Sequence, residues 1–333
     1  MELPAELQAA INTELTSVPA RRLAALVAEL SDRYRMGQAP RGGVRSGRFL
    51  QSAEDVTAYA AFRLPPIFVA VHAALRQVQE RLPDWSPSTL LDVGAGPGTA
   101  MWAAAALWPQ ALKEITLLER NEDMIALGRR LAACSLLSPV REAKWQRADL
   151  LGEWTAAPHD LVIASYVLGE LPADRGLAVI RRLWDLTRHT LVIVEPGTPA
   201  GFLRIKEARG HLLAAGGATV APCPHDQPCP LADQDWCHFS QRLARSRLHR
   251  QVKAGELSYE DEKFSFVALS RLPGTPIGAR VVRHPQSRPG HIHLDICTPA
   301  GISRRTVTRK DKQQFRLARN LQWGSSLPPD DRT

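Results

Sequence analysis

A change of hydrophobic period at Thr89 constrains the fold of this chain more than any other feature. Beyond that residue short apolar runs alternate with stretches of helical period, and the apolar runs are TLLDVGAGPG (89–98), EITLLER (114–120), DLVIASYVL (160–168) and TLVIVEPG (190–197). Strands that are separated by helices of roughly 10–15 residues form a parallel sheet covered on both faces. The sequence therefore predicts a doubly wound α/β domain with its sheet core at residues 89–215.

A region that predicts helices precedes this core, and a region that predicts short strands follows it. The first part of the chain has apolar positions at three- and four-residue spacing and predicts helices, with a Gly/Arg-rich loop at 37–48. The run EKFSFVALSR (262–271) is expected to add a late strand to the sheet, and β-like runs between Pro and Gly turns follow it. We therefore divide the chain into an N-terminal helical region (1–83), a core with a cysteine-rich insert at 221–242 (84–271) and a small, basic, β-rich C-terminal extension (272–333).

A glycine-rich loop joins the first predicted strand to the helix that follows it. Gly94, Gly96 and Gly98 lie in this loop, where glycine allows a tight turn and a close approach of the backbone to a ligand. The spacing G-x-G-x-G differs from the dinucleotide pattern G-x-G-x-x-G, and the Lys-Ser/Thr pair of a P-loop is absent. Pyrophosphate binding is therefore the weaker interpretation of this loop.

The loop resembles the first motif of the class I S-adenosylmethionine-dependent methyltransferases, in which an acidic and a hydrophobic residue precede G-x-G-x-G, as Asp92 and Val93 do here. The resemblance implies that Glu119 accepts hydrogen bonds from both ribose hydroxyls and that Asp149 lies near the adenine. Taken singly, Glu119 is equally well a solvated charge and Asp149 a turn cap. The implied set for binding S-adenosyl-L-methionine is Asp92, Gly94, Ala95, Gly96, Gly98, Glu119, Arg120, Asp149, Leu150 and Ser165.

No catalytic motif follows the fourth strand of the core. Methyl transfer from a sulfonium to a nucleophilic acceptor needs little acid–base chemistry, so positioning can supply most of the rate. The Asn/Asp-Pro-Pro-aromatic element of amino-directed nucleic-acid methyltransferases is absent, and Ser165 to Leu168 stand in its place. Tyr166 and Glu170 are candidates for orienting an acceptor, although a core tyrosine and a glutamate at a helix N-terminus are equally ordinary. The sequence leaves open whether the chain transfers a methyl group.

Three of the five cysteines fall within fifteen residues: Cys223, Cys229 and Cys237. In a reducing compartment, clustered cysteines favour a metal or redox site over disulfides. The spacing C-x5-C-x7-C lacks the C-x2-C element of zinc fingers, so a fourth ligand must come from elsewhere, and the candidates are His225, His238 and Cys297. A fourth thiolate would allow zinc or an iron–sulfur cluster, whereas an imidazole would favour zinc. The remaining Cys134 is expected to be a small buried apolar residue.

The combination of glycine loop and cysteines resembles one family, the methyltransferase-like proteins of small-ribosomal-subunit assembly, known from mitochondria and with bacterial members. The matching stretches are LLDVGAGPGTAMWAA, SYVLGEL, VIVEPGTPAGF, CPHDQPCPL, WCHFSQR and YEDEKFSFVALSR. The resemblance implies a [4Fe–4S] cluster, with zinc as the alternative, on Cys223, Cys229, Cys237 and Cys297. It also implies association with small-subunit rRNA or a pre-small ribosomal subunit, and no DNA or membrane partner is expected.

Positive charge is concentrated in the C-terminal third. Residues 240–333 carry 18 Lys and Arg against 8 Asp and Glu, a net +10, so the remainder of a chain with formal charge +8 carries −2. A basic region favours a polyanionic partner, although a solvated surface is the ordinary alternative. The run SQRLARSRLHRQVKAG (240–255) predicts a helix that could follow phosphates. The predicted RNA-binding residues are Arg242, Arg245, Arg304, Arg305, Arg309, Lys310 and Lys312.

The first residues, MELPAELQAAINTELTSV, show neither a secretory nor a mitochondrial leader pattern, and no run approaches the ~18 apolar residues of a membrane span. A cytoplasmic protein is therefore expected. The functional hypothesis is an S-adenosylmethionine-binding, iron–sulfur-containing, rRNA-associated factor for small-subunit assembly. The alternatives are an active rRNA methyltransferase and a small-molecule methyltransferase with a structural zinc site.

Overall fold

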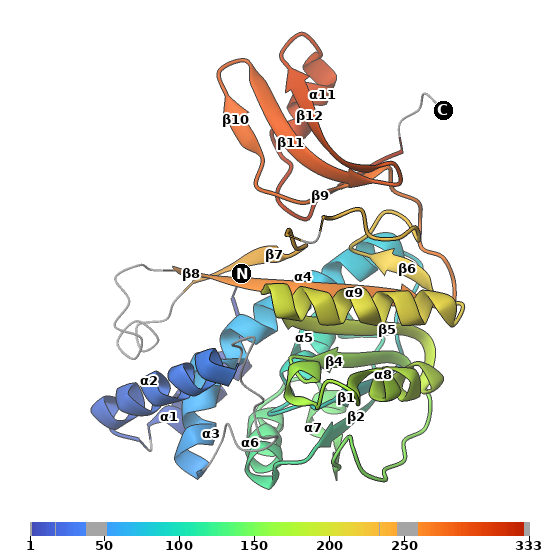
Figure 1. Cartoon of the computed structure of the whole chain (residues 1–333). Coiled ribbons are helices and arrows are strands. Elements are labelled where there is room, and N and C mark those ends of the chain that lie inside the picture. Colours follow the sequence, from blue (N-terminus) through green and yellow to red (C-terminus); the bar gives the residue numbers. More distant parts are fainter. Residues whose placement is uncertain (1, 17, 38–51, 233, 245–258, 330–333) are drawn as a thin grey trace.

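The computed structural model of the chain describes residues 2–16, 18–37, 52–232, 234–244 and 259–329 (Figure 1). Within these residues an eight-stranded sheet forms the main domain, and a second, five-stranded sheet lies in the C-terminal extension. Figure 1 shows the extension stacked beside the last strands of the main sheet, away from the first three N-terminal helices.

The main sheet has the strand order β3-β2-β1-β4-β5-β8-β6, and β7 pairs with the first half of β8. Its strands are β1 (Thr89–Val93), β2 (Glu114–Glu119), β3 (Lys144–Arg147), β4 (His159–Ser165), β5 (Thr187–Pro196), β6 (Ala218–Ala221), β7 (Phe239–Ala244) and β8 (Tyr259–Ser270). The first five strands run parallel, whereas β8 is antiparallel to both β5 and β6. A reversed strand at this place is the topology of class I methyltransferases, so the predicted α/β fold is confirmed.

Helices cover both faces of the main sheet because they form the crossovers between its parallel strands. These elements are α5 (Thr99–Leu107), α6 (Glu122–Ala133), α7 (Ser138–Arg141), η1 (Leu168–Glu170), α8 (Gly176–Asp185) and α9 (Pro199–Ala214). Two of these crossover helices begin at a side-chain cap. For α6, Asn121 accepts a hydrogen bond from the Met124 amide (3.1 Å), and for α9, Thr198 accepts one from the Gly201 amide (3.1 Å). Helices α8 and α9 pack in one apolar cluster, and α5 and α6 pack in the other with the N-terminal helices.

The N-terminal region is helical, with α1 (Ala5–Leu15), α2 (Ala20–Gly37), α3 (Ala53–Phe62) and α4 (Leu64–Arg81). The apolar side chains of α4 are buried against the main domain. Among the described helices, no single one is long and apolar enough to cross a membrane, although the bent pair α3 and α4 together meets the length and composition criteria. The loop expected at 37–48 lies outside the described residues except for its first position.

The C-terminal extension is built from short strands around its own small core. Its elements are β9 (Ala279–Val281), β10 (Gln286–Arg288), β11 (His291–Thr298), β12 (Gly301–Thr308), α11 (Lys312–Ala318) and β13 (Ser326–Leu327). Strand β11 is central because it pairs with β9, β10 and β12. Val281, Ile292, Leu294 and Ile296 are nearly fully buried between this sheet and α11.

The prediction of a helix over residues 240–255 is wrong for residues 240–244, the part that the structure describes. Phe239–Ala244 form strand β7, and residues 245–258 lie outside the described part of the chain. Phe239 and Leu243 are buried, and the Phe239 ring packs against Phe264 and Phe266 of β8. Burial against β8 therefore outweighs the local helical pattern, because intrinsic propensity is a weak determinant beside tertiary packing.

Candidate cofactor cleft and metal centre

The glycine loop after β1 takes a conformation that L side chains rarely adopt. Gly94, Gly96 and Gly98 have φ values of 65°, 55° and 82°. The amides of Gly94 and Ala95 donate to the Leu118 carbonyl (2.8 and 3.0 Å), which holds the loop over the end of β2. A Cβ added at Gly94 would lie 2.4 Å from Cγ2 of Val167, so only glycine fits there.

Two carboxylates flank this loop, and each has acceptor capacity left for a ligand. Glu119 accepts hydrogen bonds from the Gly96 amide (2.8 Å) and the Asn121 amide (2.8 Å), one on each oxygen. Asp92 is fully buried; its Oδ2 accepts from the Met101 amide (3.2 Å), while its Oδ1 has no partner. Burial raises the pKa of Asp92 to about 7. An unpaired buried acceptor fits a cofactor that brings donors, as the ammonium and hydroxyl groups of S-adenosylmethionine do.

The other residues expected at the cofactor lie at the same edge of the sheet. Asp149 accepts from the Leu151 amide (3.0 Å), so its side chain caps a turn, and Leu150 is buried beside it. Ser165 ends β4 and is partly exposed. Arg120, directly after β2, lies 3.8 Å from Glu170 of η1, the turn that follows β4, so the two side chains approach each other from both sides of β1.

Tyr166 and Glu170 differ in how firmly they are fixed. Tyr166 has a φ of 56°, and its hydroxyl donates to Glu262 Oε1 (3.0 Å) while the Arg63 guanidinium lies 5.4 Å from its ring centre. A left-handed aromatic residue is strained, and strain of this kind concentrates at functional sites. Burial raises the pKa of Glu170 to about 7 against the opposing charge of Arg120, although 35% of its side chain is exposed.

Glu195 of β5 holds the segment after β4 and was not expected from the sequence. It is fully buried, pairs with Arg204 (2.7 Å) and accepts a hydrogen bond from the Leu168 amide (3.1 Å). Its only sequence signal is an acidic residue inside the apolar run TLVIVEPG. Glu195 therefore positions η1, the turn that carries Glu170.

The four predicted cysteines line one cavity between the main domain and the extension: Cys223, Cys229 and Cys237 from the insert, and Cys297 from β11. The cavity measures about 40 Å³, more than the roughly 10–15 Å³ that one water needs. His225 also lines it, with Nε2 3.7 Å from the Cys297 sulfur, whereas His238 does not. Within the described residues, no three His, Cys, Asp or Glu side chains are grouped so that they could hold a metal ion.

The cysteine sulfurs are held in an environment that opposes their ionisation. Burial, together with the other three cysteines, raises the pKa of Cys237 well above its usual range. Burial and the charges of Cys223 and Cys229 raise the pKa of Cys297 to about 12. A bound cation reverses this effect because coordination removes the thiol proton.

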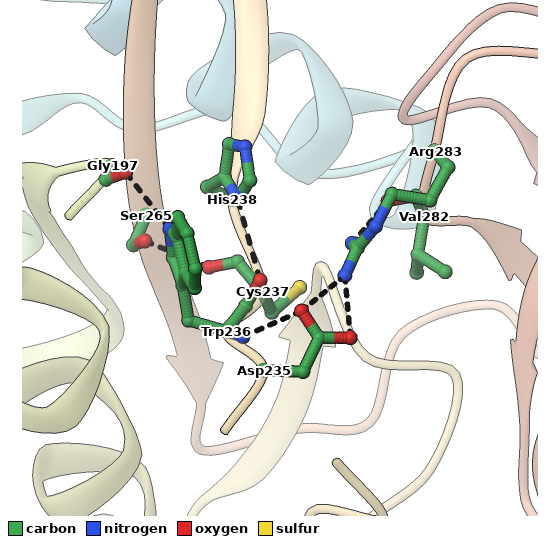
Figure 2. A network of polar contacts seen from close by, with 8 residues as sticks. All are labelled: Gly197, Asp235, Trp236, Cys237, His238, Ser265, Val282 and Arg283. Carbon is green, nitrogen blue, oxygen red and sulfur yellow. Dashed lines mark hydrogen bonds and ion pairs between the residues drawn. The ribbon is translucent and has the colours of Figure 1, made fainter. Parts of the chain in front are cut away.

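Hydrogen bonds fix the last part of the insert against both sheets (Figure 2). The Trp236 indole donates to the Gly197 carbonyl (3.0 Å), and the Ser265 hydroxyl donates to the Cys237 carbonyl (2.7 Å). Asp235 pairs with Arg283 of the extension (2.6 Å). Cys237 is therefore placed by contacts to the main sheet on one side and to the extension on the other.

Two buried arginines also line the cysteine cavity. Arg209 and Arg280 are almost fully buried, and each has one N–H group without an acceptor, at Nε and Nη2 respectively. Buried, unpaired donors on cations fit an anionic group, and a metal held by four thiolates is one. The cavity therefore has the residue types that a metal–thiolate centre needs, four cysteines and two buried cations, although the described positions of the side chains are not grouped as a metal site.

One known family matches most of this chain. The family model described as mitochondrial small ribosomal subunit Rsm22 matches residues 53–328. The chain belongs to the Rsm22 family. The predicted resemblance is confirmed by this match.

The relatives of this chain include the human mitochondrial ribosome assembly protein METTL17, which is 34% identical over 81% of this chain and 62% of its own length. The Rsm22-cox11 tandem protein 2 of Schizosaccharomyces pombe is 25% identical over 82% of this chain and 43% of the relative. The mitochondrial ribosome assembly protein RSM22 of Saccharomyces cerevisiae is 22% identical over 97% and 74%. The chain thus spans less than two thirds of the first two relatives.

The structures of several solved methyltransferases resemble this chain weakly. An O-methyltransferase family protein from Burkholderia thailandensis is 14% identical, with a TM-score of 0.47 over 75% of this chain and 72% of that one. The magnesium protoporphyrin IX methyltransferase of Synechocystis, with bound S-adenosylmethionine, is 15% identical, with a TM-score of 0.41 over 72% and 90%. The fold assignment accordingly depends on the strand order of the main sheet.

The expected cytoplasmic location is wrong in the light of the family. The family model is described as mitochondrial, and the human and both yeast relatives are named as mitochondrial proteins. The expectation came from the missing leader pattern in the first residues, and that observation does not determine a compartment.

The side chains predicted to contact RNA fall into three groups. Arg242 pairs with Asp261 (2.8 Å) and Arg304 with Asp295 (2.7 Å), so both already have carboxylate partners. Arg245 lies outside the described residues. The others lie on β12, in the turn after it and at the first residue of α11: Arg305, Arg309, Lys310 and Lys312. Of these, Arg309, Lys310 and Lys312 are exposed.

Proposed function

We propose that this member of the Rsm22 family binds S-adenosylmethionine and a [4Fe–4S] cluster and assists assembly of the small ribosomal subunit through contact with its rRNA. The observation that carries the proposal is that four cysteines, from two distant segments, line one cavity where a methyltransferase-type domain joins its extension. The names of the relatives supply the assembly role.

The cofactor part of the proposal rests on the left-handed glycine loop and the two carboxylates beside it. Asp92 Oδ1 needs a donor, and Glu119 is oriented by two backbone amides, so both are prepared for ligand donors. S-adenosylmethionine, when bound, supplies an electrophilic methyl group. Glu195 and Arg204 would hold the turn after β4, whose first part packs beside Gly94 through Val167.

In the metal part of the proposal, Cys223, Cys229, Cys237 and Cys297 are the ligands. A cluster held by these thiolates would covalently join the insert to β11 of the extension. Because ligands from distant segments meet only in the folded chain, its binding energy would stabilise the junction. Zinc on the same four thiolates is the alternative, and sulfide analysis separates the two.

The RNA part of the proposal rests on the exposed cations after β12. Arg309, Lys310 and Lys312 are exposed, and such side chains contact phosphates without reading sequence. Charge from these residues would position the extension on rRNA.

A second candidate, an active rRNA methyltransferase, is favoured by one observation. Tyr166 is strained directly after β4, and burial raises the pKa of Glu170, in the turn that follows, to about 7. The test is transfer of a labelled methyl group to small subunits isolated from a strain that lacks this protein. Incorporation at one nucleotide supports the enzyme, whereas retained subunit binding without incorporation supports the assembly factor.

A further inference from the structure

Three arginines are almost completely buried around the insert: Arg81 of α4, Arg209 of α9 and Arg280 of β9, which are 5%, 6% and 1% exposed. Within the described residues they are the only arginines below one tenth exposure, and none of them forms an ion pair with a carboxylate. A guanidinium is always charged, and a buried charge without a counter-charge is strongly unfavourable. Their position therefore requires a source of negative charge.

The same arginines have hydrogen-bond donors that nothing in the chain uses. Arg280 donates from Nε to the Pro222 carbonyl (2.8 Å) and from Nη1 to the Gly324 carbonyl (2.8 Å), but its Nη2 has no acceptor. Arg209 donates to the His225 carbonyl (2.6 Å) and has a free Nε. Arg81 has two N–H groups without an acceptor, Nε and Nη1.

Two of the three arginines lie at the cysteines, and Arg81, outside the cavity, is influenced first by the charge of Asp226 and then by Cys223. Arg209 and Arg280 line the four-cysteine cavity, and both act electrostatically on Cys223. Arg81 acts on Cys223 and on Arg280. Of the two carboxylates that act on the group, Glu80 pairs with Arg76, and Asp226 supplies one negative charge against three guanidinium charges. Positive charge therefore remains in excess at the cavity.

We infer that Arg81, Arg209 and Arg280 form a cationic shell whose counter-ion is the metal–thiolate centre itself. The inference rests on the proposed centre and assigns these residues a role in holding it. Four thiolates around a divalent zinc ion or a [4Fe–4S] core with two positive charges leave a net charge of two negative units. The shell neutralises this charge and supplies N–H donors to the sulfurs, and the residues that orient and neutralise a metal site determine its affinity and potential.

The shell also connects the centre to the extension. Arg280 belongs to β9, and its two hydrogen bonds reach Pro222, next to Cys223, and Gly324, near the end of the extension. The Arg81 carbonyl accepts a hydrogen bond from the Thr275 amide (2.7 Å), in the segment that leads into β9. Metal loading and docking of the extension are thereby coupled through the same side chains.

The test compares the full-length protein with Arg209→Met and Arg280→Met, after anaerobic purification and reconstitution with iron and sulfide. The variants should hold metal roughly 10- to 100-fold more weakly in a chelator titration. Where the parent holds an iron–sulfur cluster, its reduction potential should fall in the variants, because loss of a positive charge disfavours an added electron. Arg209→Lys, which keeps the charge, should recover part of both properties.

The matched control is Arg63→Met. Arg63 is also largely buried, at 16% side-chain exposure, but it lies 3.9 Å from Glu262 and does not line the cysteine cavity. This variant should retain metal as the parent does. A parallel loss in Arg63→Met would mean that removing any buried arginine loosens the centre, and it would overturn the specific role of the shell.

Thermal unfolding with and without metal covers the case in which Arg280→Met does not fold. Arg209 has a single backbone hydrogen bond to lose, so Arg209→Met should lower the Tm of the loaded protein more than that of the metal-free protein. Equal shifts in both forms, or parent-like metal retention in Arg209→Met, would overturn the shell while leaving the centre intact. A parent protein that binds neither iron nor zinc would overturn the proposed centre and the shell together.

Discussion

Gly94→Ala should damage the cofactor loop in two separable ways. The backbone at Gly94 has a φ of 65°, a region that costs an L residue about 1–2 kcal/mol. The added Cβ would also lie 2.4 Å from Val167 Cγ2, and overpacking of this kind costs about 1–3 kcal/mol. Together the free energy of unfolding should fall by about 2–5 kcal/mol.

Val167→Ala in the same chain separates the two contributions. It removes the 2.4 Å contact with Cγ2 but leaves the Val167 Cβ 2.8 Å from the added Cβ and does not relieve the backbone strain, so the double variant should lose less stability than the sum of the single variants by about 1 kcal/mol. Urea unfolding of the four proteins gives this coupling, and calorimetry with S-adenosylmethionine should show weaker binding in Gly94→Ala. Gly176→Ala is the control, because nothing lies within 4 Å of the added Cβ.

The result that would refute the reasoning is a Gly94→Ala protein that unfolds like the parent, or a double variant whose losses add. Either result would mean that Val167 does not pack on the glycine loop as described.

Three further predictions concern the cysteine centre, the buried carboxyl and the basic surface. Cys297→Ser should lose bound metal and expose the extension to protease, whereas Cys134→Ser, at an exposed cysteine away from the cavity, should do neither; metal analysis and timed proteolysis decide this. Asp92 has a pKa raised by burial from 3.8 to about 7, so its neutral form favours the fold and its contribution to stability is lost as pH rises through that interval. Asp92→Asn should therefore flatten the decline in stability of the cofactor-free protein between about pH 4 and pH 7, and a parallel decline in both proteins would contradict the assignment. Charge reversal of Arg309, Lys310 and Lys312 to Glu should weaken rRNA binding most at low salt, because it reduces the salt slope by about one for each phosphate that the variant no longer neutralises. Lys113→Glu, on the main domain, should leave both the affinity and the slope unchanged.

The sheet of the main domain could be predicted because its strands are local signals. Apolar runs ending in glycine or an acidic residue locate β1, β2, β4 and β5 without any tertiary information. Strand β7 could not be predicted in this way, since Phe239 and Leu243 are also compatible with a helix, and only packing on Phe264 and Phe266 selects the strand.

Side chains whose role depends on distant partners are the part that the sequence does not reveal. Arg81, Arg209 and Arg280 are of a type that is usually exposed, and only the fold brings them to the cysteines. Glu195 is similar, because its partners are Arg204 and a backbone amide on another strand's turn. Cys134 is exposed rather than buried as expected, since it lies at the end of α6, where the helix faces solvent.

Iron, zinc and acid-labile sulfide in anaerobically purified, full-length protein test the central claim most directly, with the visible absorption spectrum recorded on the same sample. The account predicts iron and sulfide in equal amounts, roughly four of each per chain, and their loss in Cys297→Ser. One zinc per chain without sulfide would contradict the iron–sulfur assignment. A protein that holds neither metal would contradict the four-cysteine centre.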